Sequence, residues 1–150
     1  MSRQAMAAFL YRAAGSPSFT APKTSPFVDV PTSSPFYKEI AWLAHKGISK
    51  GSKVSGGKFA FKPDEPVSRQ AMAAFLYRAA GSPKFTAPKK SPFVDVATDA
   101  PFYKEIAWLA DKGISTGSKV GGGKFAFKSA ESVSRQAMAA FLHRAPDPDV

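Results

Sequence analysis

Apolar side chains recur at three- and four-residue intervals in two kinds of segment, which is the pattern of helices that bury one face. The first kind spans residues 35–46 and is repeated at residues 101–112. Its predicted buried stripe consists of Phe36, Ile40 and Leu43. Ser34 is placed to cap the first copy, because a serine side chain can accept a hydrogen bond from the first turn. Gly47 and Gly113 favour the left-handed turn that ends a helix.

The second kind of helix is predicted over residues 69–80, and its copies start at Arg3 and Arg135. Ser68 is the natural N-cap of this helix. The predicted buried stripe consists of Met72, Phe75, Leu76 and Ala79. The residues expected to stop the three copies are Gly15, Gly81 and Pro146. Each full repeat therefore combines one helix of the first kind with one helix of the second kind.

A glycine-rich loop separates the two helices of a repeat. Gly56 and Gly57 favour a tight turn there. In residues 58–62, Phe59 and Phe61 occupy every second position between Lys58, Ala60 and Lys62, so a short strand or hairpin is expected beside the turn. Residues 82–92 are rich in Pro, Ser and Lys, which predicts an extended linker. The expected fold class is mostly α, with tandem helix–loop–helix repeats and short loops resembling β-hairpins.

The chain repeats itself with a period of 66 residues. The same nine-residue string begins at Ser2, Ser68 and Ser134. Of the 66 positions in residues 16–81, 52 are identical in residues 82–147. We therefore predict one domain, residues 1–150, built from repeats. Its parts are the second half of a motif at 1–15, full motifs at 27–81 and 93–145, and linkers at 16–26 and 82–92.

Five short strings follow one another in the same order in each full motif, and only the fourth differs between the copies, with Ser129 in place of Pro63. In the first motif they are Phe-Val-Asp-Val, Pro-Phe-Tyr-Lys-Glu-Ile-Ala-Trp-Leu-Ala, Gly-Ile-Ser, Phe-Lys-Pro and Val-Ser-Arg, at residues 27–30, 35–44, 47–49, 61–63 and 67–69. This order resembles the S-layer homology (SLH) motif. The ending Arg-Gln-Ala-Met-Ala-Ala-Phe-Leu-Tyr-Arg resembles actinobacterial versions of it. The resemblance covers almost the whole chain apart from the linkers.

The resemblance implies a pseudo-threefold bundle of motifs. It also implies a cell-wall anchoring module that tethers an exported protein non-covalently to an anionic secondary cell-wall polysaccharide at the cell surface. In the family, the arginine of a Thr-Arg-Ala-Glu signature helps to bind the anionic group in a groove between motifs. Ser68-Arg69-Gln70-Ala71 stands in that place here. The arginine is kept and the acidic residue is absent.

Three arginines are candidate contacts for an anionic glycan. Arg3, Arg69 and Arg135 occupy the first helical position, where the helix dipole disfavours a cation. Helix N-termini attract anions and arginine forks around carboxylates, so these residues predict an anion-binding corner. The alternative is pairing with a nearby carboxylate such as Asp29 or Asp95, or exposure to solvent. For the two aspartates themselves, capping of the local backbone is favoured.

The other candidate glycan contacts lie on the first helix and in the loop after it. They are Trp42, Trp108, Lys53, Lys62, Lys119, Lys128, Ser49, Gly51, Ser115 and Gly117. Tryptophan stacks on sugars, but it is also a common half-buried core residue, and the core is slightly favoured here. Lysines in the loop would steer a polyanion or simply face solvent. The serines and glycines offer hydroxyl and backbone donors, or only shape the turn.

The net charge of +10 indicates an anionic partner. The chain has no cysteine, and neither His45 nor His143 recurs in the other copy, so no metal, no cofactor and no enzyme activity is expected. Nucleic acid is a disfavoured partner because the basic residues are concentrated in loops. The second helix is expected to expose alanines such as Ala73 and Ala74 instead of base-reading polar side chains.

No apolar run approaches the ~20 residues that a membrane helix requires, so membrane insertion is not expected. The first residues resemble a signal peptide, but the same string recurs twice inside the chain, which places any export signal outside it. One alternative function is a self-associating module in which two chains complete each other's bundle as a homodimer. The other is nonspecific binding of a polyanion or nucleic acid.

Overall fold

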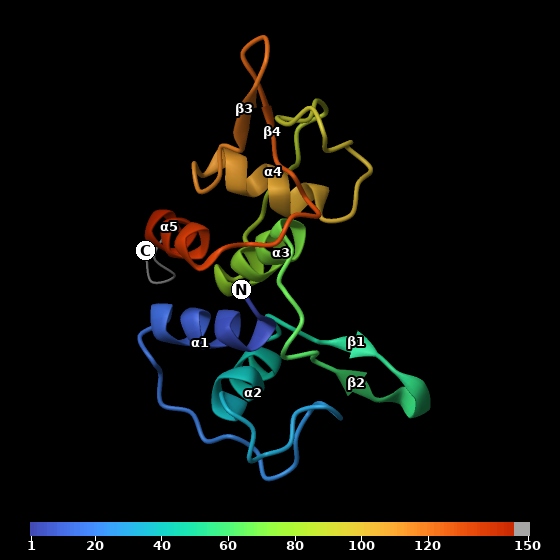
Figure 1. Cartoon of the computed structure of the whole chain (residues 1–150), viewed down its shortest axis with the longest axis vertical. Helices are drawn as coiled ribbons and strands as arrows, with labels where there is room; N and C mark the ends of the chain where they lie inside the picture. Colours follow the sequence, from blue (N-terminus) through green and yellow to red (C-terminus); the bar gives the residue numbers. More distant parts are fainter. Residues whose placement is uncertain (146–150) are drawn as a thin grey trace. The chain divides into compact units, whose positions relative to one another are not determined.

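The computed structural model describes residues 1–145, which contain five α-helices and two small β-hairpins (Figure 1). The mostly α fold class predicted from the sequence is confirmed. The chain forms two compact units, residues 1–67 and the part from residue 68 onward. The boundary falls just before the helix that starts at Arg69. Each unit therefore begins with a helix of the second kind and continues into a helix of the first kind.

The first unit contains α1 (Arg3–Ala13) packed on α2 (Tyr37–His45). Strands β1 (Ser52–Lys53) and β2 (Phe59–Ala60) pair antiparallel, with Ser52 opposite Ala60. A 3₁₀ turn, η1 (Ser55–Gly57), connects them. Gly56 and Gly57 have φ values of +74° and +71°, so the tight turn and the hairpin predicted here are confirmed.

The second unit repeats this arrangement and adds one helix. Helix α3 (Arg69–Ala79) packs on α4 (Tyr103–Asp111). Strands β3 (Ser118–Val120) and β4 (Lys124–Ala126) form its hairpin. Helix α5 (Arg135–Arg144) follows the hairpin.

Serine caps begin all three helices of the second kind, as predicted. The side-chain oxygens of Ser2, Ser68 and Ser134 accept hydrogen bonds from the backbone N–H three residues later. Gly15 and Gly81 follow the ends of the first two helices with φ values of +82° and +85°, which confirms them as stops. Pro146, the stop predicted for the third helix, lies outside the described residues.

The start of the first helix was predicted wrongly. Ser34 makes no side-chain cap, and Phe36 precedes the helix in a left-handed conformation with φ of +60°. That residue turns the chain just before the first turn, so its ring leaves the helical stripe and is 37% exposed. Tyr37 takes its place in the core beside Ile40. The predicted left-handed ends at Gly47 and Gly113 are confirmed, each with φ of +69°.

The alanines of the second-kind helices are buried, contrary to the prediction that they face solvent. Ala7 and Ala73 have no exposed surface, and Ala8 and Ala74 have almost none. Small side chains let two helices approach closely, and α1 and α3 each pack on a first-kind helix. The alanines are therefore explained by helix packing and are not evidence for or against a nucleic-acid surface.

Asp95 joins segments that are far apart in the sequence. Its carboxylate oxygens accept hydrogen bonds from the backbone N–H groups of Phe127 and Lys128, both at 2.8 Å. Asp29 does the same in the first unit, to Phe61 and Lys62. The predicted backbone cap exists, but it is not local, because the donors lie more than thirty residues away.

Tyrosine hydroxyls hold each linker against the helices that flank it. In the first unit, the Tyr11 hydroxyl donates to the Pro17 carbonyl at 2.5 Å, and the Tyr37 hydroxyl donates to the Pro22 carbonyl at 2.6 Å. The second unit repeats both bonds. Among residues 1–145, no helix has the length and apolar character needed to cross a membrane.

Candidate functional site

Arg69 is held at its ε nitrogen by the backbone of its own unit. Its Nε–H donates to the Phe127 carbonyl at 2.6 Å, and its guanidinium carbon lies 4.8 Å from the centre of the Phe127 ring. Arg3 repeats both contacts with Phe61 in the first unit, at 2.6 and 4.9 Å. A stacked, hydrogen-bonded guanidinium has few remaining rotamers, so its Nη groups are presented in a fixed direction.

The backbone N–H groups at the start of α3 already have partners. Those of Arg69 and Gln70 donate to the carbonyls of Glu131 and Ser129, at 2.8 and 3.0 Å. The N–H of Ala71 donates to the capping Ser68 hydroxyl. An anion therefore gains little from this helix end itself, and the anion-binding corner predicted there has to be built from side chains.

Burial lowers the pKa of the Arg69 guanidinium from its ordinary value, because desolvation disfavours the charged form. The carboxylates of Glu131 and Asp95 act in the opposite direction but do not offset this effect. The pKa of Arg3 is lowered for the same reason, against Glu65 and Asp29. A partly desolvated cation of this kind is stabilised by an incoming anion.

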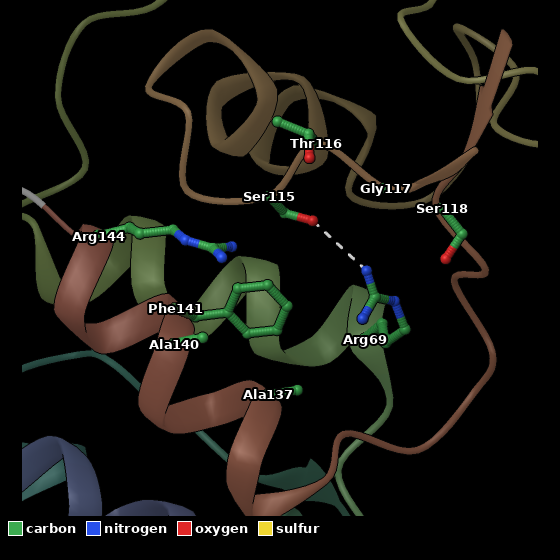
Figure 2. A pocket seen from close by; sticks show the side chains of 9 residues that line it. All are labelled: Arg69, Ser115, Thr116, Gly117, Ser118, Ala137, Ala140, Phe141 and Arg144. Carbon is green, nitrogen blue, oxygen red and sulfur yellow. Dashed lines mark hydrogen bonds between the residues drawn. The ribbon is translucent and has the colours of Figure 1, made fainter. Parts of the chain in front are cut away.

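A pocket of about 220 Å³, open to solvent, lies next to Arg69 in the second unit (Figure 2). It is lined by the start of α3, the loop between α4 and β3 with the first residue of β3, and one face of α5. The lining residues are Arg69, Ser115, Thr116, Gly117, Ser118, Ala137, Ala140, Phe141 and Arg144. Two of the nine are arginines and none is acidic, so the pocket is positively charged.

The two arginines reach the pocket from different elements. Arg69 Nη2 donates to the Ser115 hydroxyl at 3.4 Å, and Arg144 Nη1 donates to the Ile114 carbonyl at 3.2 Å. The Phe141 ring lies between them in Figure 2, with its centre 5.5 Å from the Arg69 guanidinium carbon. Planar guanidinium groups, a hydroxyl and an aromatic ring are together suited to an anionic sugar.

Gly117 is required by close packing as well as by its backbone conformation. Its φ is +73°, and a Cβ built there would lie 2.6 Å from the Ala126 carbonyl oxygen and 2.7 Å from a carbon of the Phe93 ring. Gly51 occupies the same position in the first unit. Both glycines therefore shape the loop, which is one of the two roles predicted for them. Gly117 also lines the pocket.

The structure brings together three of the residues predicted from the sequence: Arg69, Ser115 and Gly117. Arg144 was not predicted as a site residue, although an arginine follows each first-position arginine after nine residues. That pattern places Arg144 in the last turn of α5, two turns beyond Ala137. The pattern alone cannot show that this turn faces the loop between α4 and β3.

Both tryptophans lie in the core, which is the role that the sequence slightly favoured over stacking on a sugar. Trp42 is 5% exposed and Trp108 is 1% exposed, so neither ring has a face available to a ligand. Each makes an edge-to-face contact with a tyrosine of the neighbouring helix, at 5.4 Å between ring centres. The buried Trp108 Nε1–H has no hydrogen-bond partner among the described residues.

The predicted lysines are exposed and do not line the pocket. Lys53 and Lys119 lie on the hairpins. Lys62 and Lys128 pair with the glutamates three residues later, at 3.4 and 3.9 Å. Exposed pairs of this kind contribute little to stability, so a role in steering an anion remains the prediction for these side chains.

The remaining predicted residues lie outside the pocket of the second unit. Ser49 is buried in the loop after α2, as Ser115 is after α4. Arg3 is half-buried at the start of α1, whereas Arg135 is exposed at the start of α5. Their predicted role as ligand contacts therefore rests on the sequence pattern.

Comparison with protein families gives one match. The model of the S-layer homology domain matches residues 26–73 and 92–139, which together make up more than half of the chain. Among curated proteins, none matches the chain. S-layer homology domains bind cell-wall polysaccharides and generally anchor proteins to the cell wall, and the family is not enzymatic. With two matched repeats and the resemblance of its motif strings confirmed, the chain belongs to the S-layer homology domain family.

Proposed function

We propose that this chain tethers an exported protein to the cell surface by non-covalent binding of an anionic secondary cell-wall polysaccharide. The observation that carries the proposal is the pocket of the second unit, which contains Arg69 and Arg144 and no acidic side chain. Arg69 is half-buried and Arg144 is exposed at the mouth of the pocket, and no lining side chain supplies a counterion. An anionic group on a sugar supplies that charge.

The pocket can recognise the sugar by both charge and shape. The Arg69 fork binds a carboxylate through its Nη groups, because Nε is already bonded to Phe127. The hydroxyls of Ser115, Thr116 and Ser118 border the same space and can exchange hydrogen bonds with sugar hydroxyls. The net charge of +10 attracts the polymer before these contacts form.

The test is a pull-down of the purified chain on cell-wall sacculi, before and after acid extraction of their attached glycans. Binding that disappears with the glycans supports the proposal. An equal mass of duplex DNA serves as the control for a nonspecific polyanion. Equal binding to stripped sacculi, or a preference for DNA, would overturn the assignment to a wall glycan.

A second candidate function is self-association, and a comparison of the three second-kind helices favours it. Ala7 and Ala73 are fully buried in α1 and α3, but the corresponding Ala139 of α5 is exposed. Leu142 is half-buried, although its counterparts Leu10 and Leu76 are almost fully covered. This face of α5 has the composition of a helix-packing surface. A second chain would cover it.

Sedimentation over a hundredfold range of protein concentration tests this second candidate. A monomer–dimer equilibrium that is shifted to monomer by Ala139→Glu supports self-association through α5. A monomer at all concentrations, with no response to the substitution, excludes it. Wall binding by that monomer would leave the anchoring function as the sole candidate.

A further inference from the structure

Helix α5 is attached to the second unit by few buried side chains. Of its ten residues, only Met138 and Phe141 are buried, whereas the eleven residues of α3 bury six. A short helix with so little buried apolar surface is expected to detach from its unit more readily than α3. Each additional contact to α5 therefore changes the population of the docked state by a large factor.

Arg144 is a contact of this kind, because it joins α5 to the loop that forms the opposite wall of the pocket. Its Nη1–H donates to the Ile114 carbonyl at 3.2 Å, and its guanidinium points into the pocket (Figure 2). This bond uses one of the five guanidinium N–H groups. The side chain can therefore hold the loop and contact a ligand at the same time.

Arg69 faces the same pocket from α3. Its position is fixed by the Phe127 carbonyl and the Phe127 ring, so it does not follow α5 when α5 moves. The two guanidinium groups carry like charges in a pocket without an acidic side chain. An anion between the two guanidinium groups is attracted by both, so it favours the position of α5 in which Arg144 lies at the pocket.

We propose that one anionic sugar residue bound in this pocket bridges Arg69 and Arg144 and thereby locks α5 onto the second unit. The inference rests on the proposed function and assigns Arg144 as a second anion contact. A volume of about 220 Å³ lies below the range of about 300–1,000 Å³ typical of drug-sized ligands, and the pocket is open to solvent, so one sugar residue occupies it while the rest of the polymer extends outward.

Because the bridged state requires docked α5, the ligand binds the docked form and not the detached form. A ligand at a hundred times its Kd then lowers the population of the detached form about a hundredfold. Amide hydrogen exchange measures this population directly, since the helical N–H groups of α5 exchange when it detaches. Ligand binding and helix docking should therefore change together.

The experiment compares hydrogen exchange of the full chain with and without soluble polysaccharide released from sacculi by muramidase digestion. In the wild type, we expect residues 135–145 to exchange at least tenfold more slowly at saturating polysaccharide. Arg144→Gln should weaken polysaccharide binding about tenfold, which is the usual effect of losing a charge-assisted hydrogen bond. At saturation this variant should show little additional protection of α5. Arg144→Lys, which keeps the charge, should recover part of both effects.

Lys90→Gln is the matched control. It removes one positive charge from an exposed position of the second unit outside the pocket lining, and it should behave as the wild type. The wild type could bind polysaccharide while residues 135–145 exchange at the same rate with and without it. That result would overturn the proposed locking of α5 and leave the anchoring function intact. Full affinity and full protection in Arg144→Gln would also overturn the locking of α5. If the wild type does not bind polysaccharide, the proposed function itself fails.

Discussion

Arg69 combines two roles in one side chain. Its Nε–H supports the unit through the Phe127 carbonyl, while its Nη groups face the pocket. Lysine provides the charge but neither the fork nor the second donor direction. The sequence alone predicted the arginine as an anion contact, yet it could not show that Nε is already occupied, because the partner carbonyl lies 58 residues away.

The first prediction concerns this division of roles. Arg69→Gln should weaken binding to sacculi about ten- to a hundredfold, because hydrogen bonds to charged groups contribute about 1.5–3 kcal/mol each. Binding isotherms with labelled chain measure the loss, and circular dichroism checks that the helix content is unchanged. Lys90→Gln controls for the lost charge. An unchanged isotherm for folded Arg69→Gln would remove Arg69 from the site.

The glycines of the second hairpin provide a second prediction at the residue scale. Gly117 and Gly122 share a left-handed conformation, with φ of +73° and +70°, but only Gly117 lacks space for a side chain. Gly122→Ala should cost about 1 kcal/mol of unfolding free energy from backbone strain, and Gly117→Ala about 2–5 kcal/mol from strain and overlap together. Urea titrations of the two variants give the difference directly. Equal losses would mean that the loop relaxes around the new methyl group.

At the scale of elements, the sequence predicted what depends on local pattern. The second-kind helices with their serine caps, and the glycine stops of both kinds of helix, follow from the spacing of apolar, Ser and Gly residues and lie where expected. The start of the first helix was predicted wrongly because Phe36 is left-handed, a conformation that is uncommon for residues other than glycine and that no local signal in the sequence marks. The prediction of the pocket residues was incomplete for a related reason. Arg144 lines the pocket only because α5 packs beside it, and the sequence does not show this packing.

The aspartate of the Phe-Val-Asp-Val string acts at this scale, because it ties one segment to the chain that follows the hairpin. Asp95→Ala leaves two backbone N–H groups without their acceptor. We expect a loss of about 2 kcal/mol of unfolding free energy and faster hydrogen exchange at Phe127. Asp99→Ala is the control, since Asp99 is exposed and a serine occupies its place in the first motif. Equal effects of the two substitutions would contradict the structural role of Asp95.

At the scale of the whole molecule, the charge of +10 predicts how binding responds to salt. Raising the ionic strength from 0.1 to 1 M shortens the screening length from about 10 to about 3 Å. The association rate with wall polysaccharide should therefore fall steeply, while the dissociation rate changes less, because the contact with half-buried Arg69 acts at short range. Kinetics on immobilised polysaccharide separate the two rates. An association rate independent of salt would argue against steering by the exposed lysines.

The tyrosine hydroxyls on the linkers have a consequence for mechanical load, which a wall anchor has to carry. An unattached linker lengthens by up to about 3.5 Å per residue before it transmits force. Here the bonds to Pro17 and Pro22 divide the first linker into short spans, and each span is fastened to a different helix of the same pair. Tension along the chain therefore reaches the packed helices after little extension. Under the proposed function, this limited extension of the linkers keeps an anchored protein close to the wall under shear.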